Sequence, residues 1–394
     1  MYKRQLNGRT PGLDKRVEAM RQEIKSYAIP VLQQLNSQVM EANNFEKSGL
    51  EVAAYNRMVI SAMLFRMTME TVDVLEAMYK GDFAKVEERI VALSQVQTKA
   101  DALGLELGIN ARKKTLGGLV NSVASYSMYA LSYSLVNLGR SHYQRAHEII
   151  DLINAKKIPQ TEAALNQMVS DLLKPVGYFA AAEAILQAAR EQMDFAPEEG
   201  ADISIDPGKF ARLAKAFGSA AAAGIAYFDS TVVKSAAESS SVTLQQAKDY
   251  FVQADGNYLI APMLADLAAV ADRVVSDKPE AALLRLSAGA AAFIQSGGLI
   301  NKYYSLGFTR NADGTAVLKE RRALSSQLEL AKRSALAAAG EAKKLVGFIP
   351  ATARLAFEDA SALREGDDED KLEALTGYWS SAFWSRLVVT LARP

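Results

Sequence analysis

The feature that most constrains the fold of this chain is a weak internal repeat of helical character. Similar segments begin at Val176–Phe179, Gly256–Leu259 and Val346–Ile349, with starts 80 and 90 residues apart. In each segment an Ala-rich helical stretch follows the start, and an acidic or proline-marked break leads into a second apolar helix. Self-similarity at a long period is typical of chains built from stacked helical units.

Long helical periodicity, interrupted by short Gly, Pro or Asp breaks, covers most of the chain, and strand-like alternation is rare. We therefore predict an all-α protein of long antiparallel helices, with divergent helical-hairpin repeats forming a bundle or a short array. Asp82 can cap the helix that opens at Phe83, and Pro279 suits a first helical turn. The predicted helices cover residues 11–42, 47–79, 82–105, 109–138, 140–155, 160–194, 208–236, 242–254, 258–275, 279–306, 316–345, 350–364 and 368–392.

Three segments carry the signals of loops. Residues 196–208 are rich in helix breakers, and the Asp-Gly turn within Thr309–Thr315 could close a small hairpin. The acidic connector Arg364–Asp370 ends where carboxylates stabilise a helix amino terminus. A division near residues 156–160 would give an N-terminal helical region, 1–156, and a C-terminal repeat region, 157–394, with units starting near 176, 256 and 346.

Composition excludes several classes of function. The 45 basic and 45 acidic side chains cancel, so we expect no nucleic-acid binding. The chain has no cysteine, which excludes disulfides and thiolate metal sites. Residues Met1–Pro11 carry charge, but no apolar core follows them, so a cytoplasmic location is our default expectation. A periplasmic location stays open if the sequence is a trimmed piece of a longer chain.

The stretch Thr115–Gly139 has no charged residue and is long enough to span a membrane, but its many serines favour a buried central helix. Within it, Tyr126, Tyr129 and Tyr133 share one helical face. This face is either a tyrosine-lined seam between helices or the wall of a groove for a ligand or partner.

Small residues recur every four positions in two later helices. One set contains Ala214, Gly218, Ala222 and Ala226, and the other contains Ala288, Ala292 and Ser296 beside Gly289 and Gly297. Small side chains at this spacing let two helices approach closely, so we expect tight packing there.

The last predicted helix gathers four bulky aromatic residues, Tyr378, Trp379, Phe383 and Trp384, which include both tryptophans of the chain. A terminal helical unit lacks a neighbour on one face, so these side chains either pack inward and close the array or stay exposed for a partner. They complete our set of candidate surface residues for a partner or ligand.

Motifs of known chemistry are missing from the sequence. His142 and His147 are five residues apart, which puts them on different faces of a helix, so we expect no metal site. No phosphate-binding loop, dinucleotide-binding fingerprint, His-Glu-x-x-His or Gly-x-Ser-x-Gly motif is present. The sequence therefore identifies no catalytic residue and no cofactor.

These observations favour a non-enzymatic scaffold or adaptor that binds a protein partner or associates with itself. Two alternatives stay open. A carrier of lipid or another hydrophobic ligand, or a membrane-associated protein, would enclose the ligand or enter lipid with its small-residue and tyrosine-lined helices. An enzyme of an unrecognised helical type would need buried titrating groups that converge in one pocket.

Overall fold

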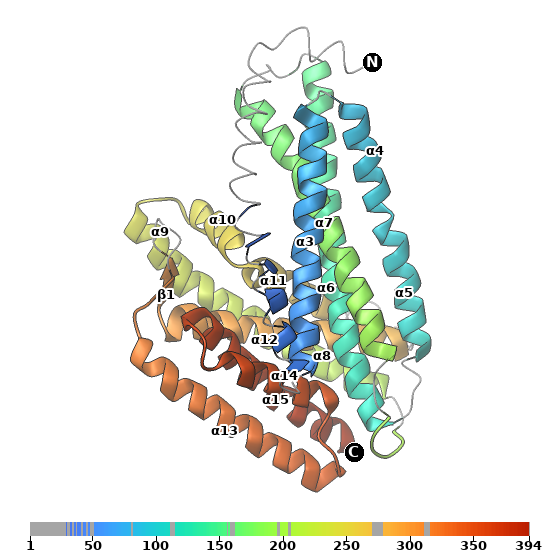
Figure 1. Cartoon of the computed structure of the whole chain (residues 1–394), viewed down its shortest axis with the longest axis vertical. Coiled ribbons are helices and arrows are strands. Elements are labelled where there is room, and N and C mark those ends of the chain that lie inside the picture. Colours follow the sequence, from blue (N-terminus) through green and yellow to red (C-terminus); the bar gives the residue numbers. More distant parts are fainter. Residues whose placement is uncertain are drawn as a thin grey trace. The chain divides into compact units, whose positions relative to one another are not determined.

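The all-α prediction is confirmed by a computed structural model, in which helices cover 89% of the described residues (Figure 1). The structure describes scattered positions between 29 and 47, and then residues 51–79, 82–110, 115–155, 157, 162–194, 198–203, 206–269, 279–310 and 316–393. Most of the predicted helix 11–42 lies outside these residues.

Contacts divide the chain into two units that do not follow one cut in the sequence. Unit 1 is built mainly from Ala54–Leu103 and Ser132–Ala188, and unit 2 mainly from Gly104–Leu131 and Ala189–Pro394. The predicted division near 156–160 falls inside unit 1. Four helices, at 51–79, 96–110, 116–154 and 162–194, have residues in both units.

Unit 1 is a bundle of helices that lie side by side (Figure 1). An ion pair joins Glu70 to Arg89, and Glu183 pairs with both Arg66 and Lys99. The serine hydroxyl of Ser132 donates to a helix carbonyl across the bundle at 2.9 Å. Its helices are α3 (Glu51–Tyr79), α4 (Phe83–Ser94), α5 (Val96–Asn110), α6 (Leu116–Asn154) and α7 (Glu162–Asp194).

Unit 2 packs shorter helices around an Ala-rich and an aromatic core. Helix α12 contacts α8 and α11, and α15 contacts α13 and α14. Two short π-helical stretches interrupt the helices, and a two-stranded hairpin precedes α13. The elements are α8 (Pro207–Phe228), η1 (Asp229–Val233), α9 (Lys234–Ser240), α10 (Leu244–Ala254), α11 (Gly256–Ala269), α12 (Pro279–Leu299), η3 (Ile300–Ser305), β1 (Phe308–Arg310), β2 (Ala316–Leu318), α13 (Arg321–Val346), α14 (Ala351–Leu363) and α15 (Asp368–Ala392).

The predicted helix starts have the expected chemistry. The carboxylate of Asp82 accepts from the Lys85 amide and caps α4. The acidic connector provides Asp367, whose carboxylate accepts from the amides of Glu369 and Asp370 in a capping box at the start of α15. Such caps satisfy amides that the helix itself leaves without a partner.

Several predicted boundaries are wrong. Helix α6 runs through Gly139, where we predicted a break, and the ring of Phe179 occupies the space that a Cβ at this position would need. The predicted helix 208–236 changes to π-helix at Asp229. Residues 316–318 form β2 rather than the start of a helix. They pair with β1 in the hairpin that we expected, whose turn residues, 311–315, lie outside the described residues.

Close packing of small residues is found where α8 meets α11 and α12. A Cβ on Gly289 would lie 2.8 Å from the Ala214 carbonyl oxygen, and one on Gly218 would lie 3.0 Å from Ala268. Ala222 and Ala226 are exposed. Because an α-helix has 3.6 residues per turn, the buried face of α8 does not follow a strict four-residue spacing, and it continues from Gly218 to Ala221.

The three repeat starts lie in different structural settings. Val176 is inside α7, Gly256 begins α11, and Val346 ends α13. The repeat stays a prediction from the sequence.

Candidate functional site

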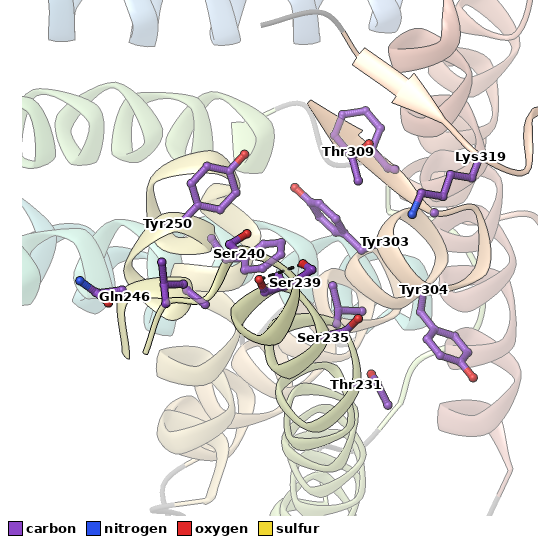
Figure 2. A pocket seen from close by; sticks show the side chains of 17 residues that line it. Thr231, Ser235, Ser239, Ser240, Gln246, Tyr250, Tyr303, Tyr304, Thr309 and Lys319 are labelled. Carbon is purple, nitrogen blue, oxygen red and sulfur yellow. Dashed lines mark hydrogen bonds between the residues drawn. The ribbon is translucent and has the colours of Figure 1, made fainter. Parts of the chain in front are cut away.

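A cleft of about 690 Å³ lies in unit 2, as Figure 2 shows. Helical elements η1, α9 and α10 form one side, and η3, the hairpin strand β1 and the residue after β2 form the other. Of the described residues that line it, Lys319 alone is charged. The lining is mostly apolar, and its polar groups are mainly hydroxyls rather than ionic groups.

Hydroxyl groups follow one side of the cleft. Thr231, Ser235 and Ser239 are spaced by four residues, so they share one face of η1 and α9. The hydroxyl of Thr231 donates to the Tyr227 carbonyl and that of Ser239 to the Ala236 carbonyl. Each hydroxyl oxygen can still accept a hydrogen bond from a ligand.

Tyrosines come from both sides of the cleft, Tyr250 from α10 and Tyr303 and Tyr304 from η3. Tyr250 and Tyr304 are each 54% exposed, which is high for large aromatic side chains. Figure 2 shows the Lys319 ammonium directed toward Tyr303, and Tyr304 turned outward at another end of the cleft. Tyr227, also exposed, packs edge-on against Tyr304 with ring centroids 5.1 Å apart. The aromatic surface therefore continues beyond the cleft itself.

The two π-helical stretches place residues of both walls. Thr231 and Val232 come from η1, and Tyr303 and Tyr304 come from η3. A π-turn adds a residue to the helical repeat and so changes the direction of the side chains that follow. Such insertions are frequent at functional sites.

Two buried or half-buried carboxylates hold the walls in place. Asp229 accepts from the Tyr258 hydroxyl at 2.5 Å and pairs with Lys248 at 2.6 Å. Burial raises the pKa of Tyr258, and the hydrogen bond to Asp229 raises it further, so the hydroxyl stays protonated and donates. On the other side, Asp255 accepts from Lys302 at 3.0 Å and from the Tyr303 hydroxyl at 3.1 Å.

An aromatic core lies behind the cleft. Phe228 contacts Phe251, Tyr258 and Tyr303 with ring centroids 5.2–5.5 Å apart, and Tyr303 contacts Phe308 at 5.5 Å. These rings meet edge-on or tilted, which is the favourable geometry for aromatic pairs. The walls of the cleft are therefore anchored in a rigid core, as a preformed binding site requires.

Two of the three tyrosines predicted on α6 are buried in unit 2. Tyr126 and Tyr129 are 2% and 8% exposed, with their rings edge-on and centroids 6.0 Å apart. The Tyr126 hydroxyl donates to the Gly104 carbonyl at 3.3 Å. Tyr133 is half-buried and belongs to unit 1. Packing explains the first two, and a partner surface at these tyrosines stays a prediction.

The aromatic residues of α15 pack largely inward within unit 2. Tyr378 and Trp384 are buried, and the half-buried Trp379 packs against the aromatic core. Phe383, also half-buried, contacts Phe217 with ring centroids 5.1 Å apart. Neither these four residues nor the three tyrosines of α6 line the cleft.

The histidines differ in environment. His142 is buried, and its Nδ1 lies 2.8 Å from Asp171, whereas His147 is half-exposed and lies 3.6 Å from Glu87. Burial lowers the pKa of His142, and the hydrogen bond to Asp171 opposes that change. The described part of the chain holds no group of three or more His, Cys, Asp or Glu side chains that could bind a metal.

One described stretch, Ala281–Ser305, is long and apolar enough to cross a membrane by length and composition. Just over half of its most apolar window, 56%, is buried inside the protein, as in many core helices of soluble domains.

No protein-family model, curated protein or solved structure matches the chain. The case for a function therefore depends on the geometry of the chain's own residues.

Proposed function

We propose that the protein is a non-enzymatic scaffold or adaptor, and that the cleft of unit 2 binds a segment of a partner protein. The observation that carries this proposal is the combination of exposed tyrosines with a row of hydroxyl groups. Tyrosine supplies large, rigid contact area, and serine and threonine supply adaptable hydrogen bonds, a combination enriched in protein-recognition surfaces.

The charge of the cleft supports a particular kind of segment. Lys319 is the one charged side chain among its described lining residues, and it comes from the end of the hairpin. A polar segment with an acidic side chain beside Lys319 would pair with it, whereas a basic segment would be repelled. Tyr250 and Tyr304 would then serve as aromatic anchors on either side.

The test is affinity capture from the cells that make the protein, with partners quantified by mass spectrometry. We expect Tyr250→Ala/Tyr304→Ala to reduce a stoichiometric partner by about 30-fold or more, since anchor residues of this kind contribute over 1 kcal/mol each. The matched control is Leu330→Ala/Leu336→Ala, which changes two equally exposed side chains on α13. Equal capture by both double variants would refute the proposal.

A further inference from the structure

A second, smaller pocket lies in unit 1, between α3 and α7. Its volume is about 320 Å³, and Leu64, Met67 and Leu173 supply apolar surface. The hydroxyls of two threonines that line it, Thr68 and Thr71, already donate to carbonyls of their own helix at 2.8 and 2.7 Å. Along this wall, therefore, the pocket can hold an apolar part of a ligand without leaving a hydroxyl donor unsatisfied.

Polar groups gather at one side of this pocket, on α7. Lys174 is exposed, and the half-buried Tyr178 lines the pocket and stacks on His142 with ring centroids 5.8 Å apart. Lys174 and Arg145 both lie close enough for their positive charge to act on His142. Burial raises the pKa of Tyr178, so its hydroxyl stays protonated and can donate to an anion.

Helix α7 contains a proline, Pro175, and a glycine, Gly177, in the region of the pocket. Pro175 has no amide hydrogen and interrupts the hydrogen-bond ladder of α7. Gly177 lines the pocket, and a Cβ placed there would meet only the Met67 methyl at 3.7 Å, an ordinary contact. A glycine inside a helix is destabilising relative to alanine. Packing does not require a glycine at position 177. The missing side chain instead leaves space in the pocket that a ligand could fill.

We propose that this pocket binds a small amphipathic anion, namely a free carboxylate with an unbranched apolar chain. The chain lies against Leu64, Met67 and Leu173, and the carboxylate lies beside Lys174 and the Tyr178 hydroxyl. A cavity of roughly 150 Å³ can hold benzene, so the volume here suits a chain of about ten carbons. This site is separate from the proposed function of unit 2, and each can fail without the other.

The test uses isothermal titration calorimetry with sodium decanoate on the full chain. Decan-1-ol and decyltrimethylammonium serve as neutral and cationic probes of the same chain length. We expect decanoate to bind about tenfold more tightly than the cationic probe, because a charge-assisted hydrogen bond is lost and a repulsion is added. Equal affinity for all three probes would show that the charge of the site plays no part and would overturn the proposal.

Two variants separate the parts of the site. Lys174→Glu should weaken decanoate binding about tenfold and leave decan-1-ol binding unchanged, whereas the control Lys332→Glu, on α13, should change neither. Gly177→Leu should fill the pocket and abolish binding of both probes, without lowering the melting temperature of the protein. Absence of decanoate binding to the unmodified protein, or binding that survives in a folded Gly177→Leu variant, would overturn the proposal.

Discussion

The contact between α8 and α12 gives the sharpest prediction about stability. A Cβ added at Gly289 would lie 2.8 Å from the carbonyl oxygen and 3.3 Å from the Cα of Ala214. Both are backbone atoms, so neither can rotate away as a side chain could. In Gly289→Ala the two helices must therefore move apart, or the backbone of α8 must distort.

The size of the effect follows from a comparison within the same helix. At Gly297, also on α12, a Cβ would meet nothing within 4 Å. Both substitutions gain about the same helix propensity, up to ~1 kcal/mol, so this gain cancels between the two variants. The remaining difference is the cost of overpacking, about 1–3 kcal/mol, with Gly289→Ala the less stable variant.

The assay is denaturant unfolding followed by circular dichroism, with hydrogen exchange to assign the change to α8 and α12. We expect a lower unfolding midpoint for Gly289→Ala than for Gly297→Ala, and faster exchange of amides in α8 near Ala214. Equal midpoints, or a more stable Gly289→Ala, would refute the close approach of these helices.

Three further predictions concern single interactions. Asp367→Ala should lower the free energy of unfolding by about 1 kcal/mol and speed hydrogen exchange in the first turn of α15, because the cap is lost. Tyr258→Phe should cost about 1–2 kcal/mol in denaturant unfolding, because the buried side of Asp229 loses its hydroxyl donor. Burial lowers the pKa of His142 below its ordinary 6.5, although Asp171 opposes this, so the folded protein favours the neutral ring. The stability that this contributes is present above pH 6.5 and is lost as the pH falls through the folded pKa. In denaturant unfolding measured at several pH values below 6.5, the unfolding midpoint of His142→Gln should therefore fall less than that of the unmodified protein.

Each of these predictions has a clear contrary result. Unchanged exchange at the start of α15 would show that the cap contributes nothing. A fully stable Tyr258→Phe would mean that water replaces the hydroxyl beside Asp229. A His142→Gln variant that keeps the full acid sensitivity of the unmodified protein would assign that sensitivity to carboxylates instead.

Much of the fold could be predicted from local patterns. Apolar periodicity located most helices, and short-range chemistry located the caps at Asp82 and Asp367. The predicted break at Gly139 is wrong because glycine is common at helix ends, whereas here a distant residue, Phe179, supplies the reason for the glycine. The π-turn at Asp229 was missed because an inserted residue leaves no mark in composition.

The cleft could not be predicted, because its walls come from segments that are far apart in the sequence. Tyr250 and Tyr304 look like ordinary helical aromatics until their exposure is known. One local signal was available in the four-residue spacing of Thr231, Ser235 and Ser239, although such hydroxyls also occur on any solvated helix. Tyr126 was a candidate for a partner surface but is buried, because a shared helical face in the sequence does not distinguish a buried seam from a groove.

The most direct test of the proposed partner site is photo-crosslinking in the cells that make the protein. A benzoylphenylalanine at position 250 probes the cleft, and the same residue at position 336 probes the exposed face of α13. The account predicts one defined protein adduct from position 250 that is lost when Tyr304→Ala is added, and no such adduct from position 336. No adduct from position 250, or the same adduct from both positions, would contradict it.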